Sequence, residues 1–138
     1  MSLNALQDDL NAEFDLPAPI DGPQIWYGPA MSASDEWMHA VSETDLAEID
    51  VAMRLLVDDD RDITQIGKAD FELPTLAPKL AAIREEVIAG RGFALIRGLP
   101  VDSWSMREAA TVYYGIGTHF GNARSQNGKG HVLGHVRD

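Results

Sequence analysis

Residues 90–100 read Gly-Arg-Gly-Phe-Ala-Leu-Ile-Arg-Gly-Leu-Pro, a short apolar run that lies between glycines and that a proline closes. The apolar segment Phe93–Ile96 is too short for a helix, and glycines and Pro100 interrupt the chain on both sides, so the pattern predicts a buried strand. It is the clearest strand signal in the sequence. We expect helical or irregular structure before this strand, and one helix and one more extended segment after it.

Two helices are predicted before the strand. Ser42 followed by Asp45 resembles a capping box, and apolar residues then follow at helical spacing as far as the acidic run at 58–60. A second helix is predicted from about Thr75 to Ala89, and Gly90 is the glycine that commonly ends a helix, so this helix leads directly into the strand. The expected apolar positions are Leu46, Ile49, Met53 and Leu56 in the first helix, with Asp45, Glu48 and Asp50 on its solvent face, and Leu80, Ile83 and Val87 in the second.

A third helix and a polar loop are predicted after Pro100. Ser105 and Glu108 form another capping-box pattern, and the helix runs toward Gly121 with Ala109, Val112, Tyr113 and Ile116 as its apolar stripe. Gly115 and Gly117 indicate either fraying near its end or close packing of its backbone against the sheet. Residues 122–130 form a polar, glycine-bearing loop, and 131–137 would form a further strand.

Size and composition favour one domain. The chain has 138 residues, is 45% hydrophobic and carries a formal net charge of -11, which opposes binding to nucleic acids or to anionic membrane surfaces. The absence of cysteine excludes disulfides, thiolate metal sites and a cysteine nucleophile. The N-terminal residues have no secretory hydrophobic segment and no apolar run is long enough to cross a bilayer, so we expect a cytoplasmic protein. Prolines and glycines within 1–36 predict an irregular arm, with a disordered leader as the alternative.

Several residues could be interpreted as metal or anion sites, but a structural role is favoured for each of them. The acidic run at 58–60 lacks the ligand pattern of a calcium loop, so a solvated loop is preferred to a cation site. His131 and His135 on one strand would lie roughly 13 Å apart, too far to bind one ion. Arg91 and Arg97 can bind an anion, but exposed arginines at strand ends are commoner. No phosphate loop or serine nucleophile elbow is present.

The order of the segments resembles that of a known family. Five segments follow one another in the chain: Asp70-Phe71-x-Leu73-Pro74, the glycine-bounded strand, Tyr113-Tyr114-Gly115-Ile116-Gly117-Thr118-His119-Phe120-Gly121, Ser125-Gln126-Asn127 and Gly134-His135-Val136-Arg137-Asp138. From about Trp37 to Asp138 the chain is similar to the N-terminal part of taurine dioxygenase family proteins, which are non-haem Fe(II), 2-oxoglutarate-dependent oxygenases of the clavaminate-synthase-like superfamily. The resemblance implies an α+β fold made of N-terminal helices and the first strands of a double-stranded β-helix (jelly roll). Because a jelly roll needs about eight strands, we expect an incomplete barrel, with an arm at 1–36 and a truncated single domain at 37–138.

The resemblance also implies a function, a cofactor set and a tentative pocket. In the family, iron held by two histidines and a carboxylate reacts with 2-oxoglutarate and oxygen to oxidise small organic substrates such as sulfonates, aryloxyacids, amino-acid derivatives and carboxylates. The family's His-x-Asp or His-x-Glu motif is absent here, and His135 and Asp138 have the wrong spacing, so no metal ligand maps onto this chain. We expect neither Fe(II) nor 2-oxoglutarate to bind it alone. The family lines its substrate pocket with the segment after the third helix, which here corresponds to Ser125, Gln126, Asn127 and His119.

Two functions follow as competing hypotheses. The first is an N-terminal fragment of a dioxygenase, inactive alone and able to self-associate through exposed sheet edges. The second is a small acidic α+β binding or regulatory module without catalysis. A monomer that unfolds cooperatively would favour the module, whereas aggregation, or a coding sequence that continues into His-x-Asp, would favour the fragment. The sequence leaves the substrate, the oligomeric state and the origin of the end at Asp138 open.

Overall fold

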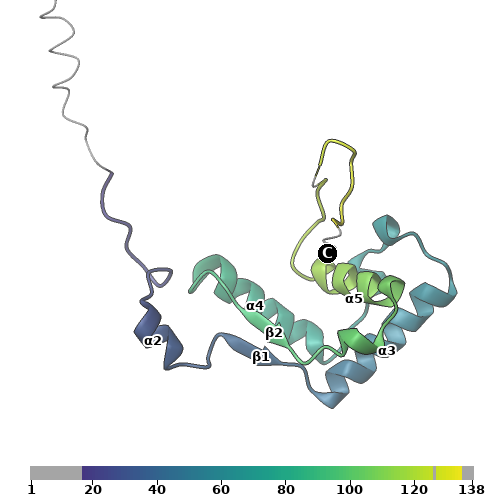
Figure 1. Ribbon diagram of the computed structural model, residues 1–138, viewed down its shortest axis with the longest axis horizontal. Helices are drawn as coiled ribbons and strands as arrows, with labels where there is room; N and C mark the ends of the chain where they lie inside the picture. Colours follow the sequence, from purple (N-terminus) through teal and green to yellow (C-terminus); the bar gives the residue numbers. More distant parts are fainter. Residues whose placement is uncertain (1–16, 126, 135–138) are drawn as a thin grey trace, which may run out of the picture.

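The computed structural model describes residues 17–125 and 127–134, in which three long helices pack on one another and a small sheet lies to one side (Figure 1). The order of elements is α2 (Gly28–Ser32), β1 (Met38–Ala40), α3 (Glu43–Asp58), η1 (Ile63–Gln65), η2 (Lys68–Asp70), α4 (Leu76–Ala89), β2 (Leu95–Arg97), η3 (Val101–Ser103) and α5 (Met106–Thr118). The predicted α+β class is confirmed, and the three long helices α3, α4 and α5 lie where the capping boxes and Gly90 placed them. The sheet of the described residues has two strands, so the structure does not confirm a jelly roll.

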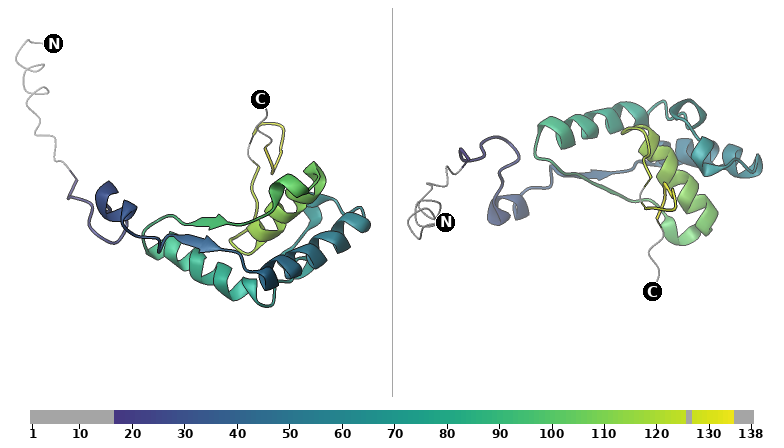
Figure 2. Two further views of the ribbon diagram at one scale, coloured as in Figure 1. Left: turned by 60° about the horizontal axis from the view of Figure 1, so that its bottom comes forward. Right: turned by 90° about the horizontal axis from the view of Figure 1, so that it is seen from above.

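The predicted strand is β2, and it pairs with a strand that the sequence did not reveal. β1 and β2 are parallel, in a register that sets Met38 opposite Leu95 and Ala40 opposite Arg97. A parallel pair needs a long crossover connection, which α3 and α4 supply here, and α4 lies alongside both strands (Figure 2). The prediction that β2 is buried was wrong in part, because Leu95 is 44% exposed. β2 is therefore a half-covered strand.

In the part that the structure describes, the N-terminal arm extends away from the three long helices (Figures 1 and 2). Its described part, 17–36, is largely exposed, and it is attached near the entrance of β2. There the ring of Trp26 meets Phe93 edge-on at 5.2 Å between centroids, and Trp37 packs on the same ring at 5.9 Å. The Trp37 indole N–H also donates to the carbonyl oxygen of Ser34 at 2.7 Å. One aromatic cluster thus connects the arm to the sheet.

The apolar core lies between α3, α4 and α5. It contains Ile49, Ala52, Met53, Leu56, Ile66, Phe71, Leu73, Leu76, Leu80, Ile83, Val112 and Ile116. Two predicted core positions were wrong: Tyr113 is 71% exposed, and Val87 lies at the surface at 39%. Phe71 is completely buried and comes from the segment between α3 and α4, which the three helices surround.

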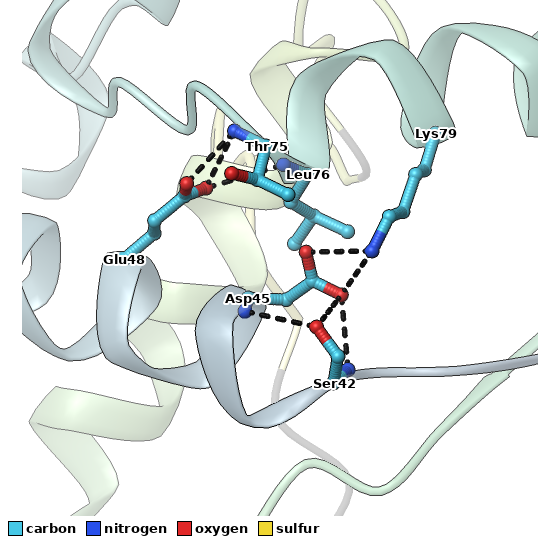
Figure 3. A network of polar contacts seen from close by, with 6 residues as sticks. All are labelled: Ser42, Asp45, Glu48, Thr75, Leu76 and Lys79. Carbon is cyan, nitrogen blue, oxygen red and sulfur yellow. Dashed lines mark hydrogen bonds and ion pairs between the residues drawn. The ribbon is translucent and has the colours of Figure 1, made fainter.

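Polar contacts from α3 hold the beginning of α4 (Figure 3). Asp45 accepts hydrogen bonds from the Ser42 backbone amide at 2.9 Å and from the Lys79 ammonium at 2.7 Å and 2.9 Å. One helical turn further on, the Glu48 carboxylate accepts from the backbone amides of Thr75 and Leu76 at 2.8–3.1 Å, which satisfies free N–H groups at the start of α4. We name these contacts of Asp45 and Glu48 the α3–α4 clamp.

The clamp corrects the prediction that Asp45 and Glu48 lie on a solvent face. Asp45 is 0% exposed. Burial by itself raises the pKa of its carboxyl group, but hydrogen bonds from Lys79 and from the amide and hydroxyl of Ser42 together hold the pKa below its usual value. The pKa of Glu48 is lowered in the same way, because the bonds from Thr75 and Leu76 outweigh the effect of its burial. Both carboxylates are therefore ionised at neutral pH.

Gly115 allows α5 to approach the core closely. A Cβ at this position would lie 2.5 Å from two ring carbons of Phe71. Of the two alternatives left by the sequence, close packing is the correct one for Gly115, although the contact is with Phe71 rather than with the sheet. Gly117 has nothing within 4 Å of such a Cβ, so the two helical glycines are not equivalent.

Substitution of the two glycines should separate packing from helix propensity. Gly115→Ala should destabilise the fold by about 1–3 kcal/mol, because the ring of Phe71 is enclosed and a new methyl group overpacks the core. Gly117→Ala should be neutral or stabilising by up to about 1 kcal/mol, since alanine favours the helix. Urea unfolding followed by circular dichroism measures both. Equal effects of the two substitutions would contradict the packing that we describe.

The clamp predicts a specific pH dependence of stability. Because the folded-state pKa of Asp45 lies below its unfolded value, its contribution is present above the unfolded value of about 4 and is lost as the pH falls through the folded pKa. Asp45→Asn should lower the free energy of unfolding by about 1–3 kcal/mol at neutral pH, and the difference from the parent should shrink below about pH 4. Urea unfolding across the pH range measures this. The exposed Asp50→Asn is the matched control and should have a much smaller effect, and a pH-independent deficit for Asp45→Asn would refute the assignment.

Candidate functional site: a cleft beside helix α5

The candidate site lies where the loop 122–134 folds back along α5. The start of α5 is fixed by the predicted capping box, in which Ser105 N–H donates to Glu108 at 2.7 Å and Glu108 N–H donates to the Ser105 hydroxyl at 3.3 Å. At the other end, the Thr118 hydroxyl donates to the carbonyl oxygen of Gly115 at 2.6 Å. The helix ends at this point, and the loop begins three residues after His119.

Asn127 organises the loop through its side chain and its backbone. Its side-chain oxygen accepts from the backbone amides of Lys129 at 3.0 Å and His131 at 3.2 Å. Its backbone oxygen accepts from the Gly130 amide at 3.0 Å and from the Ser125 hydroxyl at 2.9 Å. Gly130 has a φ of 81°, a value that favours glycine. The predicted strand at 131–137 was wrong for 131–134, which belong to this loop, and 135–137 lie outside the described residues.

The same asparagine sets the proton position of a neighbouring histidine. Because the oxygen of its amide already accepts from two backbone amides, the amide nitrogen faces Nδ1 of His131 at 3.0 Å and donates to it. In the neutral ring the proton is then on Nε2, so the exposed His131 presents an N–H donor. Nε2–H is thus the polar group of His131 that Asn127 does not engage.

Two hollows flank the half-buried Val132 and Leu133 of the loop. The larger, about 780 Å³, is lined by α5, by the segment after α3 and by 130–133, and the smaller, about 340 Å³, lies over the end of α5. We call the two together the α5 cleft. The larger hollow contains Arg61 and Arg107, of which Arg107 pairs with Asp60 at 2.8 Å. Its charges are therefore mixed, with His131 at one edge.

The predicted site residues are brought together only in part. Ser125 and Asn127 share the loop but line neither hollow of the α5 cleft, and Gln126 lies outside the described residues. His119 is buried elsewhere, with Nε2 2.8 Å from the carbonyl oxygen of Phe71, so Nε2 carries the proton and the buried Nδ1 has no partner. It borders a different hollow, beside Lys68 and Pro74. The pocket role of these residues remains a prediction.

Arg61, Arg107 and His131 border the cleft although the predicted site did not include them. The dipeptide Asn127-Gly128 is a turn signal, and it would have indicated that the loop closes near His131. Arg61 and Arg107 have no comparable local signal, because they reach the cleft from separate segments of the chain.

The two arginines beside β2 have structural contacts instead. Arg91 is mostly buried, and it bridges Glu86 at 3.3 Å and Glu36 at 3.4 Å. The expectation that it is exposed was therefore wrong. Arg97 is exposed, as expected, and its guanidinium lies 3.8 Å from the sulfur of Met38.

The described residues do not provide a ligand set for iron. Within 17–125 and 127–134, no three histidine, aspartate or glutamate side chains converge on one point. His119 is bound to the Phe71 carbonyl, and His131 is bound to Asn127. The acidic run that ends α3 pairs with arginines, Asp59 with Arg61 and Asp60 with Arg107. In the same part of the chain, no helix is both long enough and apolar enough to cross a bilayer.

The architecture is thus that of an α+β domain in which a helix and the loop after it form a cleft. Residues 59–138 match the family model described as taurine catabolism dioxygenase TauD, TfdA family. The chain belongs to this family of dioxygenases, whose members generally use Fe(II) and 2-oxoglutarate.

Two curated relatives agree with this assignment. The chain is 27% identical over 124 residues to the taurine hydroxylase-like protein SAT17 of Stachybotrys chartarum, and the aligned region covers 89% of this chain and 32% of that protein. It is 25% identical over 123 residues to FR-33289 synthase of Streptomyces rubellomurinus, and the aligned region covers 89% of this chain and 36% of that protein. The chain therefore spans about a third of the length of these relatives.

Proposed function

We propose that this chain forms the N-terminal scaffold and one wall of the substrate pocket of a non-haem Fe(II), 2-oxoglutarate-dependent dioxygenase that acts on a small organic substrate. The observation that carries the proposal is the family match over 59–138, since this range contains Phe71, α5 and the whole described part of the loop. The segment that the family uses to line its pocket is here the loop that closes the α5 cleft.

The chain's own contribution is to bind and orient the substrate. Asn127 keeps the loop segment from Ser125 to His131 folded on itself, and Gln126 belongs to the same segment. His131 offers its Nε2 proton to a polar group of the substrate, while Val132 and Leu133 provide an apolar surface beside it. A molecule with a polar end and a short carbon skeleton fits this combination of one donor and apolar contacts.

The metal chemistry is not assigned to the described residues. Because they offer no ligand set that fits iron, we derive no catalytic step from them. We infer that the chain alone is inactive, and that the dioxygenase requires ligands which these residues do not supply. Each strand of the two-stranded sheet also keeps one unpaired edge in the described part of the chain, and we propose that these edges allow self-association.

Ligand titration tests the proposed pocket. Isotope-labelled chain titrated to millimolar taurine or phenoxyacetate should show amide shift changes at 125–133 and along α5, and not on the arm. Asn127→Ala should weaken these changes and accelerate hydrogen exchange at Lys129 and His131 by roughly fivefold, because each lost bond contributes about 1 kcal/mol.

Gln65→Ala is the matched control, since it removes an exposed amide that does not border the cleft. It should leave both the shift changes and the exchange rates unaltered. Shift changes that avoid the loop, or that persist unchanged in Asn127→Ala, would contradict the proposed pocket.

A further inference from the structure

A further hollow lies on the outer face of α3, and it shares no residue with the lining of the α5 cleft. It has a volume of about 550 Å³, and we call it the α3 groove. Its lining consists of Thr44, Ala47, Glu48, Val51, Ala52, Leu55, Ala69, Asp70, Glu72 and Pro74. One wall is therefore α3, and the other is the segment that leads from η2 towards α4.

The floor of the groove is an apolar stripe that nothing in the described residues covers. Ala47, Val51 and Leu55 follow one another at intervals of four residues, so they share one side of α3. Val51 is 61% exposed and Leu55 is 67% exposed, although the opposite side of the helix already supplies the core. The stripe is not needed to attach α3 to the protein, and it continues onto Ala69 and Pro74 across the groove.

The rim of the groove carries charge of one sign. The ionisable residues of its lining are Glu48, Asp70 and Glu72, and no lysine, arginine or histidine belongs to it. Glu48 remains ionised because the amides of Thr75 and Leu76 donate to it. The arginines of the neighbouring segments are already paired, Arg54 with Asp50 at 2.8 Å and Arg61 with Asp59 and Asp70 at 3.0 Å and 3.4 Å. An occupant would therefore meet apolar surface bordered by carboxylates, of which Asp70 is already paired with Arg61 and Glu72 is exposed.

These charges discriminate among the occupants that an apolar groove can take. A second copy of the chain also carries a net charge of -11, which opposes self-docking on an acidic rim. Residues 1–16 contain Asp8, Asp9, Glu13 and Asp15 and no lysine or arginine, so they are unsuited for the same reason. The complementary occupant has apolar side chains for the stripe and cationic side chains for the rim.

We propose that the α3 groove is a docking site for a short amphipathic helix of a partner protein, with apolar side chains one turn apart flanked by lysine or arginine. The stripe from Ala47 to Leu55 spans about 12 Å, which corresponds to two to three turns of such a helix. Helices that lay an apolar face into a groove commonly present anchors at intervals of three, four and seven residues. This docking function is independent of the dioxygenase pocket and does not rest on it.

A pair of model peptides tests the proposal on the intact chain. The probe is a labelled 15-residue helical peptide with leucine anchors at three- and four-residue spacing and lysine on both flanks, and its partner has glutamate in place of every lysine. Fluorescence anisotropy should show binding of the lysine peptide that weakens at high ionic strength, and no binding of the glutamate peptide. Val51→Ser with Leu55→Ser should weaken binding by about tenfold or more, and Glu72→Lys should weaken it several-fold.

Two control variants distinguish groove binding from general attraction to an acidic protein. Ile88→Ser removes an exposed apolar side chain from α4, and Asp102→Lys reverses an exposed charge outside the groove. Both should bind the lysine peptide as the parent does. Equal binding of the two peptides, or equal weakening by the groove and control variants, would overturn the proposal. So would a dimer, seen by sedimentation, that Val51→Ser with Leu55→Ser dissociates, because the groove would then hold a second copy.

Discussion

The α3–α4 clamp is the interaction on which the rest of the structure depends. Its two carboxylates come from successive turns of α3, and they hold the first turn of α4 through Lys79, Thr75 and Leu76 (Figure 3). α4 then leads through Gly90 into β2, which pairs with β1, the strand that leads into α3. The two helices that connect the parallel strands are thus held together by the buried carboxylate of Asp45. Its hydrogen bonds lower its pKa more than burial raises it.

Phe71 connects the core to the end of α5, beside the candidate site, through two contacts. Its ring fills the space that Gly115 leaves open in α5, and its carbonyl oxygen accepts a hydrogen bond from His119 just after that helix ends. The loop that closes the α5 cleft begins three residues after His119. His119 therefore influences the cleft by fixing the end of α5, and the polar groups presented to a ligand come from the loop, where Asn127 orients His131.

Local signals in the sequence predicted local structure, and long-range pairing remained hidden. Both capping boxes and the helix end at Gly90 depend on residues within one turn of each other, so they could be identified directly. β1 is three residues long, too short to give a strand pattern in the sequence, and its partner β2 lies far along the chain. The burial of Asp45 depends on Lys79, which is 34 residues away. The resemblance indicated the family, but it could not show that His119 faces the core while His131 faces the cleft.

The central claim is that this chain supplies the scaffold and substrate side of a dioxygenase, while the iron chemistry needs ligands outside its described residues. The most direct measurement is the release of carbon dioxide from labelled 2-oxoglutarate by the purified chain with ferrous iron, after cooperative unfolding has shown that it is folded. The account predicts no turnover above that of iron alone, with or without taurine. Sustained release over many turnovers would contradict it, because the described residues would then belong to a complete active site.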